Sequence, residues 1–385
     1  MPIKAVILDV SGTLVQRSGD MVEDGPRLII RLRDLGLAVF LASNNPVPDA
    51  TLALLGVPRD GLLTRATVGG AKGSRRFVET VCSRLGIQSN ELLYLGDEDN
   101  DMREAVNSNI AFFLATWANP DYPYGFPVSS PRKFYYIVRD CFLKHALWYY
   151  RVDDADSAGR PIHVRALLSP DETKSTGIEG LLKRKVGGDA PVGEFTLSEY
   201  LSLHLLASLY LEGLHLPHAN QRPIWCLYPG HAGEQTGVLD DLATFGARLF
   251  REPYADSLIY RHQRAIKSAY ARTRGEQPTL ANQIGTIHLR RPPEVAGRRV
   301  LVFDDFTTEG YGYETARNLL LHAGATDIYG IAVGKYRRPY IAHVPRSGIV
   351  WDSYQPVPLD DTAFTHEAVR EHYDVAALND FLDVF

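Results

Sequence analysis

The chain has 385 residues, of which 45% are hydrophobic and 23% charged, and its formal net charge is -5. This length favours two domains, because one compact core rarely extends over so many residues. The mildly acidic balance argues against nucleic acid as the main partner, since nucleic-acid binders carry a strong basic excess. No apolar run reaches the roughly 18 residues that a membrane span needs.

The cysteines and the N-terminal segment indicate a cytoplasmic protein. Cys82, Cys141 and Cys226 are widely spaced and odd in number, so they predict neither a disulfide framework nor a zinc site. The first residues lead directly into a strand-like segment, without a charged leader or a cleavage site. We therefore expect a reducing compartment and a cytoplasmic location.

Three apolar runs in the first 118 residues end in residues that can carry chemistry. The runs and their end residues are 4–9 with Asp9, 37–42 with Ser43, and 92–95 with Asp97. Apolar runs that alternate with helical patterns predict a parallel sheet, and parallel sheets bind ligands at the carboxyl ends of their strands. These polar residues could therefore converge at one edge of a sheet.

Four short motifs in this region, taken in order and with plausible spacing, resemble those of the haloacid dehalogenase (HAD) superfamily. They are DVSGT from Asp9 to Thr13, then Ser43, then Lys72, and then Gly96-Asp97 with Asp101. The resemblance implies an α/β phosphatase fold that acts on a phosphorylated small molecule. The short interval between Asp9 and Ser43 leaves no room for the inserted cap domain of many relatives.

The same resemblance implies a role for each motif residue. Asp9 would attack phosphorus and form an acyl-phosphate, which divides hydrolysis into two easier steps. The other expected roles are Ser43 and Lys72 for the phosphoryl oxygens, Asp9, the Val10 carbonyl and Asp97 for Mg²⁺, and Asp101 for the orientation of this shell.

One motif residue departs from the family pattern. Phosphatases of this superfamily usually carry a second aspartate two residues after the nucleophile, as general acid and base, and this chain has Ser11 there. Loss of general acid and base help typically costs about 10² to 10⁴ in rate, so slow or absent turnover stays open beside an active phosphatase. Without a cap, the middle segment or a second subunit would have to cover the site.

The middle of the chain, residues 119–220, predicts a mainly helical segment. Residues 133–150 have the pattern of one long amphipathic helix rich in aromatic side chains, and a second helix is expected within residues 197–215. An aromatic helix face is typical of core or interface packing. We assign it no catalytic role.

A second motif begins with the apolar residues 299–303, continues with Asp304 and Asp305, and ends in a Thr/Gly-rich turn before a helical pattern. Adjacent carboxylates can accept hydrogen bonds from two ribose hydroxyls, while turn amides and a helix N-terminus hold a phosphate. The segment resembles the phosphoribosyl pyrophosphate (PRPP) motif of type I phosphoribosyltransferases. The PRPP-binding residues that this implies are Asp304, Asp305, Thr307, Thr308, Glu309, Gly310 and Gly312.

The resemblance extends over about residues 222–340, most closely to the competence-associated, ComF-like group of phosphoribosyltransferases. It implies a pyrophosphate loop at residues 228–233, with Gly230 and His231, and a mobile basic loop at residues 261–282. The basic candidates in the mobile loop are Arg264, Lys267, Arg272 and Arg274. Positioning, charge neutralisation and Mg²⁺ should supply most of the catalysis in such a transfer.

Two residues of this motif depart from the family pattern. Glu309 replaces a small hydroxyl residue, and Gly312 stands where Thr or Ser often binds phosphate. A Glu309 side chain directed into the phosphate cradle would repel the ligand, whereas one directed outward would leave the backbone amides free to bind it.

The fold class expected is α/β: two doubly wound parallel-sheet domains, a capless HAD-like domain and a type I phosphoribosyltransferase domain, joined by a mainly helical segment. The expected boundaries are 1–118 for the first domain, 119–220 for the segment, 221–345 for the second domain, and 346–385 for a tail that packs on it.

The function expected is a bifunctional, Mg²⁺-dependent enzyme of nucleotide-type metabolism. The second domain would exchange a base or amine with PRPP, and the first would remove a phosphate from a small molecule. Two alternatives stay open: a sensor that binds PRPP or a nucleotide without turnover and has a degenerate HAD domain, and a scaffold that docks through residues 133–150. The protein could form a homo-oligomer under any of these functions.

Overall fold

The computed structural model of the protein describes residues 2–144, 147–171, 191–233, 237–250, 253–265, 279–291 and 293–382. The chain forms two compact units, which are described separately. The first unit comprises Met1–His145, Leu206–Leu216 and Phe245–Arg251, and the second comprises Ala146–Leu205, Pro217–Thr244 and Glu252–Phe385. No helix in the described ranges is both long and apolar enough to cross a membrane.

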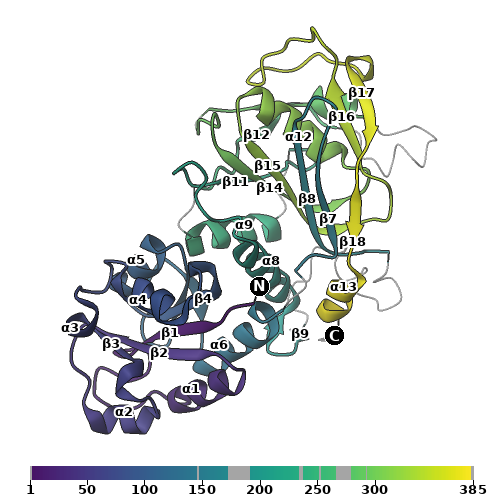
Figure 1. The fold of residues 1–385 in the computed structure, drawn as a ribbon. Helices are drawn as coiled ribbons and strands as arrows, with labels where there is room; N and C mark the ends of the chain where they lie inside the picture. The colour runs from purple at the N-terminus through teal and green to yellow at the C-terminus, as the bar shows by residue number, and fades with distance from the viewer. Residues whose placement is uncertain are drawn as a thin grey trace. The chain divides into compact units, whose positions relative to one another are not determined.

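The first unit contains a six-stranded sheet in the order β3-β2-β1-β4-β5-β6, in which every neighbouring pair is parallel. Figure 1 labels its strands β1 to β4. Its strands are β1 (Ala5–Asp9), β2 (Ala38–Ser43), β3 (Leu62–Thr64), β4 (Leu92–Gly96), β5 (Ala111–Ala115) and β6 (Phe126–Val128). The α/β expectation for this part of the chain is confirmed. The chain reverses its direction of travel across the sheet between β1 and β4, and such a switch point opens a ligand-binding crevice.

The helices of this unit follow the strands in the order expected for a doubly wound fold. They are α1 (Gly25–Asp34), α2 (Asp49–Leu55), α3 (Arg65–Val68), α4 (Arg76–Leu85), α5 (Asp99–Asn107) and α6 (Pro131–Ile137). Every residue of β1, β4 and β5 is buried, which is typical of central strands covered on both faces. The only helix between β1 and β2 is α1, so the interval holds no cap.

The prediction of one long helix over residues 133–150 is wrong. Helix α6 begins after Ser130, whose hydroxyl accepts a hydrogen bond from the Lys133 amide at 3.1 Å. It continues only as a π-helical turn, Val138–Phe142, and Tyr150 already begins a strand. Side chains along that strand alternate between buried and exposed, as expected for a strand in a sheet. Pairing with a neighbouring strand therefore outweighs the helical pattern of the sequence at Tyr150.

The second unit contains a mixed six-stranded sheet in the order β11-β14-β15-β8-β7-β18. The first four strands are parallel, and β7 and β18 are antiparallel to their neighbours. The strands are β7 (Tyr150–Ala155), β8 (Pro161–Leu168), β11 (Ile224–Leu227), β14 (Arg299–Thr307), β15 (Asp327–Lys335) and β18 (Glu371–Tyr373). Two strands of this sheet, β7 and β8, therefore come from the segment predicted to be mainly helical. We expected a purely parallel sheet, and the structure shows a mixed one.

Smaller elements complete the second unit. Two antiparallel hairpins lie between strands of this sheet along the chain. One pairs β12 (Ile259–Arg261) with β13 (Ile287–Leu289), between β11 and β14, and the other pairs β16 (Ile341–Pro345) with β17 (Phe364–Ala368), between β15 and β18. A two-residue pair joins β9 (Pro191–Val192) and β10 (Phe195–Thr196). The helices α11 (Ala281–Ile284), α12 (Tyr311–His322) and α13 (Val375–Leu382) lie within this unit. The division into units runs through α8 (Leu197–Glu212) after Leu205 and through α9 (Gly237–Phe250) after Thr244.

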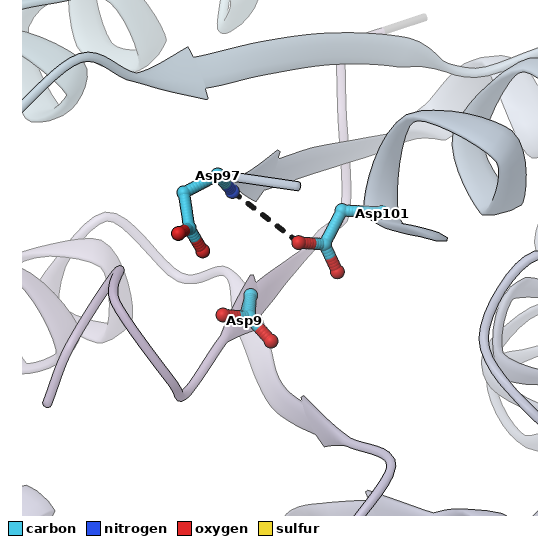
Figure 2. A group of neighbouring side chains, drawn as sticks. All are labelled: Asp9, Asp97 and Asp101. Atoms are coloured by element: carbon cyan, nitrogen blue, oxygen red, sulfur yellow. Dashed lines mark hydrogen bonds between the residues drawn. The ribbon is translucent and has the colours of Figure 1, made fainter. Parts of the chain in front are cut away.

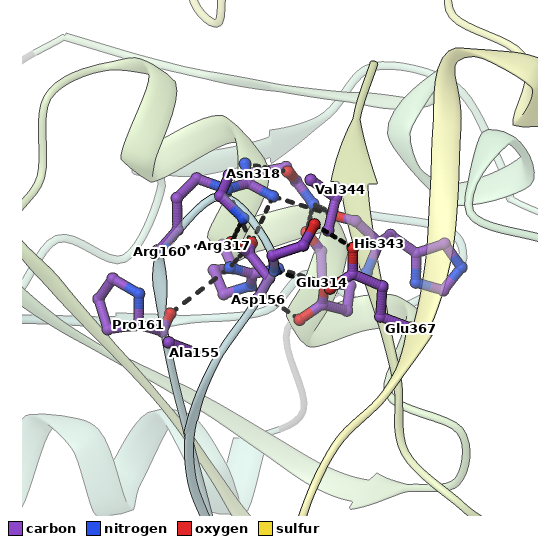
Figure 3. A network of polar contacts seen from close by, with 12 residues as sticks. Ala155, Asp156, Arg160, Pro161, Glu314, Arg317, Asn318, His343, Val344 and Glu367 are labelled. Atoms are coloured by element: carbon purple, nitrogen blue, oxygen red, sulfur yellow. Dashed lines mark hydrogen bonds and ion pairs between the residues drawn. The ribbon is translucent and has the colours of Figure 1, made fainter. Parts of the chain in front are cut away.

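A buried network of charges fastens α12 to the β7–β8 turn and to β16 (Figure 3). Arg317 pairs with Glu314 at 2.7 Å and with Asp156 at 3.0 Å. The same Glu314 carboxylate accepts hydrogen bonds from the Tyr340 hydroxyl at 2.8 Å and from the His343 amide at 2.6 Å. This network fixes the helix that follows the Asp304-Asp305 segment.

Candidate active site

Three carboxylates meet at the switch point of the first sheet (Figure 2). Asp9 is the last residue of β1, Asp97 directly follows β4, and Asp101 lies in the first turn of α5. One carboxylate oxygen from each residue lies within 4.8 Å of the other two, and all three side chains are buried. The fold thus brings together residues that the sequence could only suggest as neighbours.

Lys72 provides the cation of this cluster. Its ammonium nitrogen lies 2.5 Å from Asp9 Oδ1, 2.7 Å from Asp101 Oδ1 and 3.5 Å from a Glu98 carboxylate oxygen. The backbone amide of Lys72 donates to Asn44 Oδ1 at 2.8 Å, which ties the residue to the carboxyl end of β2.

Asp101 is held by several donors. The Tyr94 hydroxyl donates to Oδ1 at 2.9 Å, and the backbone amides of Asp97 and Glu98 donate to Oδ2 at 3.2 and 3.3 Å. Asp101 therefore orients both the lysine and the turn that carries Asp97.

The cluster suits a hard divalent cation. Asp9 Oδ2 is buried and has no hydrogen-bond partner among the described residues, so a cation shared with Asp97 would satisfy it. The Val10 carbonyl is different: it accepts hydrogen bonds from the Leu14 and Val15 amides at 3.1 and 2.8 Å. Both of its lone pairs are engaged, which leaves the carboxylates as the ligands that fit Mg²⁺.

The pKa values reflect the crowding of negative charge. Burial, followed by the charge of Asp101, raises the pKa of Asp9 well above its usual range, and burial with the same neighbour raises that of Asp97 to about 6. Burial lowers the pKa of Lys72, but the Asp101 and Asp9 carboxylates outweigh it and raise the pKa above its ordinary value. The lysine is therefore protonated, and the cluster still favours a further cation or proton.

The two predicted serines lie in different surroundings. Ser43 ends β2, is buried, and its hydroxyl accepts a hydrogen bond from the Asn45 amide at 3.2 Å. Its strand is the direct neighbour of β1, so Ser43 lies at the same sheet edge as Asp9. Ser11 is exposed, and its hydroxyl has no hydrogen-bond partner within the described ranges.

Glu104 is a site residue that the sequence did not reveal. Its fully buried carboxylate accepts four backbone N–H bonds, from Gly73 at 2.8 Å, Arg75 at 3.0 Å, Phe77 at 2.9 Å and Val78 at 3.2 Å. Two of these amides belong to the first turn of α4, so Glu104 caps that helix from another element. It thereby fixes the loop that begins at Lys72.

The acidic pair of the second unit lies near the carboxyl end of β14. Asp304 and Asp305 are partly exposed, and burial and the charge of Asp305 raise the pKa of Asp304. Strand β14 continues through Thr307, whose carbonyl accepts a hydrogen bond from the Tyr336 amide at 3.0 Å. The turn is therefore shorter than the sequence indicated: Thr308, Glu309 and Gly310 connect β14 to α12, and Gly312 lies in the first turn of that helix.

The Glu309 carboxylate accepts a hydrogen bond from Arg338 at 3.3 Å. Its backbone carbonyl accepts one from the Ile341 amide at 3.1 Å. The acidic side chain is thus charge-compensated by an arginine of its own unit.

Arg261 joins the predicted pyrophosphate loop to the β12–β13 hairpin. This buried guanidinium donates to the Gly230 carbonyl at 2.7 Å, to the Pro229 carbonyl at 3.2 Å and to Gln283 Oε1 at 3.2 Å. Its charge also opposes the upward shift in the pKa of Asp304 that burial and Asp305 cause. The basic loop was expected from the sequence, but this residue was not singled out.

The remaining candidates of the second unit are placed only in part. His231 is half-buried, and its carbonyl accepts a hydrogen bond from the Ala265 amide at 2.8 Å, while Arg264 is exposed. Lys267, Arg272 and Arg274 lie outside the described residues.

A scan against protein-family models found no match for the chain, and a search of curated proteins found none. Solved structures similar to the chain include a cobalt-bound deoxy-D-mannose-octulosonate 8-phosphate phosphatase from Haemophilus influenzae, at 19% identity, a TM-score of 0.29, and coverage of 36% of this chain and 87% of that one. Another is a putative HAD family hydrolase from Streptomyces avermitilis, at 20% identity, a TM-score of 0.27, and coverage of 35% and 90%. A HAD-superfamily hydrolase from Geobacter sulfurreducens has 16% identity, a TM-score of 0.30, and coverage of 34% and 97%.

Proposed function

We propose that the first unit is a Mg²⁺-dependent phosphomonoester hydrolase of the HAD type. One observation carries this proposal: Asp9, Lys72, Asp97 and Asp101, brought from separate parts of the chain, form one buried cluster at the switch point of a parallel sheet. Pairing of an acidic nucleophile with a lysine and further carboxylates is the arrangement that phosphoryl transfer through an acyl-phosphate requires.

In the proposed reaction, an Asp9 carboxylate oxygen forms a bond to phosphorus, and the bond between phosphorus and the ester oxygen breaks. The electron pair leaves with the ester oxygen, which takes its proton from water because Ser11 is too weak an acid. Water then hydrolyses the acyl-phosphate and regenerates Asp9. Lys72 compensates the negative charge, and Mg²⁺ bound to Asp9 and Asp97 would supply further neutralisation of the phosphoryl group.

Release of inorganic phosphate from a panel of phosphomonoesters, with and without Mg²⁺, tests this function. We expect release that needs Mg²⁺ and is abolished by Asp9→Asn. The exposed Asp34→Asn variant, at the end of α1, is the matched control and should retain the native rate. Release that is equal in Asp9→Asn and native protein would overturn the assignment.

We also propose that the second unit binds PRPP and exchanges its pyrophosphate for a base or amine. The supporting observation is that β11 and β14 are adjacent parallel strands. Residues 228–233 and the Asp304-Asp305 pair lie at the carboxyl ends of these strands. Arg261 donates a hydrogen bond to the Gly230 carbonyl of the first segment, and its positive charge opposes the rise in the pKa of Asp304 in the second. Together with the first unit this would make a bifunctional enzyme of nucleotide-type metabolism.

Calorimetric titration of PRPP into the full chain with Mg²⁺ tests the second proposal. We expect binding that Asp304→Asn abolishes while phosphate release by the first unit stays unchanged. Pyrophosphate release with a panel of bases and amines then separates a transferase from a sensor, which would bind PRPP without turnover. No PRPP binding by the native chain would overturn both readings and favour a scaffold.

A further inference from the structure

A cavity of about 420 Å³ opens in the first unit beside the carboxylate cluster. It lies between the turn that follows β1 and the loop that follows β5, and its lining includes Gly12, Gln16, Arg17, Glu23 and Trp117. No step of the proposed hydrolysis uses these five residues. A cavity at this place can hold the part of a phosphate ester that extends away from the phosphoryl group.

Gly12 links the cavity to the carboxylate cluster. Gly12 lines the cavity, has a φ of 91°, and a Cβ at this position would collide with the Asp97 carboxylate, so its backbone lies directly against Asp97. A ligand in the cavity therefore lies against the backbone that borders Asp97.

The aromatic side of the cavity is fixed to the same cluster. The indole nitrogen of Trp117 donates to the Thr13 carbonyl at 3.1 Å, and the Thr13 hydroxyl lies 3.4 Å from Asp97 Oδ1. In the same loop, the Asn119 amide group donates to the Asp97 carbonyl at 2.9 Å. The indole ring is thus held in one orientation by bonds that lead to the candidate metal ligand.

The polar side of the cavity is unpaired. Gln16, Arg17 and Glu23 are exposed, and their side chains form no hydrogen bond or ion pair within the described ranges. One amide, one cation and one anion therefore surround an oriented indole ring, and together they carry no net charge.

We infer that this cavity binds the organic part of the phosphate ester and selects an uncharged ring that bears hydroxyl groups. The inference rests on the phosphatase function proposed above and names its substrate class. A flat or sugar-like ring can pack on the Trp117 indole, which supplies contact area at low entropic cost. Ring hydroxyls both donate and accept, so they can satisfy Arg17, Gln16 and Glu23 together.

Other organic groups fit this lining less well. An alkyl chain would take the amide and both charges out of water without replacing their hydrogen bonds. A second phosphate would gain from Arg17 but would be repelled by Glu23. A linear polyol would satisfy the polar groups and leave the indole face without a stacking partner.

The test is calorimetric titration of the full chain with Mg²⁺, using inorganic phosphate and three phosphonate analogues that cannot be hydrolysed. The analogues mimic a hexose phosphate, a nucleoside monophosphate and glycerol phosphate. We expect one or both ring analogues to bind about tenfold more tightly than the glycerol analogue and inorganic phosphate. Whichever ring analogue shows this preference identifies the source of the ring.

Two substitutions assign the preference to the cavity. In Trp117→Ala the ring preference should fall to about twofold, whereas Trp117→Phe, which keeps an aromatic face, should retain most of it. Trp351→Ala in the second unit is the matched control. Arg17→Ala should weaken the ring analogues about threefold and Arg27→Ala should not, because Arg27 is exposed and paired with Asp24 outside the cavity.

The outcomes separate this inference from the function on which it rests. If the native chain binds no inorganic phosphate with Mg²⁺, the proposed phosphatase site itself is wrong. If inorganic phosphate binds but the ring analogues bind no more tightly than the glycerol analogue, the cavity inference alone is overturned. Equal weakening of all four ligands in both Trp117→Ala and Arg17→Ala would also overturn it.

Discussion

The acidic groups of the two units differ in how their members are spaced along the chain. Asp9 and Lys72 are 63 positions apart, yet their side chains are in direct contact. Asp304 and Asp305 are adjacent in the sequence and would be close in any fold. Convergence of distant residues needs a specific tertiary structure, so the first cluster is the stronger sign of a built site.

Among the described residues, each unit also buries one lysine, and the two have opposite pKa shifts. Lys72 contacts two carboxylates, which raise its pKa. Lys335, at the end of β15, donates to the Tyr336 carbonyl at 2.7 Å and to that of Arg338, and a Glu371 oxygen lies 3.9 Å away. Burial therefore lowers the pKa of Lys335 to about 8. Only the first lysine is held as a permanent charge by carboxylates.

Replacement of Lys72 should have the largest effect. Lys72→Met leaves the buried carboxylates of Asp9 and Asp101 without their cation, and we expect a loss of roughly 3 to 5 kcal/mol in unfolding free energy. Phosphate release should fall at least about 10³-fold, because the charge of the phosphoryl group is no longer compensated. Urea unfolding and phosphate release measure the two effects.

Arg59→Met is the matched control for this substitution, because Arg59 pairs with Asp49 and both side chains are exposed at the surface. It should cost less than about 1 kcal/mol. Equal destabilisation by the two substitutions would show that the cluster is no tighter than a surface ion pair.

The second largest change should be a gain. Ser11→Asp supplies the carboxylate that the HAD pattern places two residues after Asp9, and Ser11 is exposed and free of hydrogen bonds in the described structure. We expect phosphate release to rise by about 10², since general acid and base help is restored. Steady-state kinetics measure the rise, and an unchanged or lower kcat would show that Ser11 does not limit turnover.

Replacement of Glu104 should come next. Glu104→Ala removes the acceptor of four backbone N–H groups, and we expect a loss of about 3 kcal/mol in unfolding free energy. Hydrogen exchange should accelerate at residues 73, 75, 77 and 78 before other amides of α4. Glu79→Ala, on the exposed face of the same helix, is the control, and the same exchange pattern in that variant would contradict the capping role.

The smallest effect concerns pH and Lys335. Its pKa is about 8 in the folded chain and ordinarily 10.5, so above about pH 8 the unfolded chain binds more protons, and unfolding free energy rises with pH. Between about pH 7.5 and pH 9 the native chain should gain roughly 1 kcal/mol relative to Lys335→Met. Denaturant unfolding of both proteins at both pH values measures this difference. The same change in unfolding free energy with pH in the native chain and in Lys335→Met would show that Lys335 is not buried as a poorly solvated ammonium.

The sequence predicted the first sheet well because its signals are local. The buried strands β1, β2 and β4 appear in the sequence as apolar runs that end in polar residues, and each run forms a strand at that place in the structure. Strands β7 and β8 were missed although they pair with each other across a short turn, because their other partners in the sheet, β18 for β7 and β15 for β8, lie far along the chain. Helical periodicity within residues 133–150 carries no information about such pairing.

The site residues divide in the same way. The sequence singled out Asp9, Ser43, Lys72, Asp97 and Asp101, because short motifs surround each of them. It did not reveal Glu104, Arg261 or Trp117, whose roles come from backbone groups that only the fold brings near. A glutamate inside an amphipathic helix gives no sign that it caps a different helix.

The most direct test of the carboxylate cluster is a search for its phosphorylated form. The full chain, incubated with Mg²⁺ and acetyl phosphate and quenched in acid, is digested and analysed by mass spectrometry. We predict a phosphoryl adduct on Asp9 that needs Mg²⁺, is absent from Asp9→Asn, and accumulates because Ser11 cannot assist its hydrolysis. An adduct on another residue, or no adduct together with no phosphate release, would contradict the assignment of Asp9 as the nucleophile.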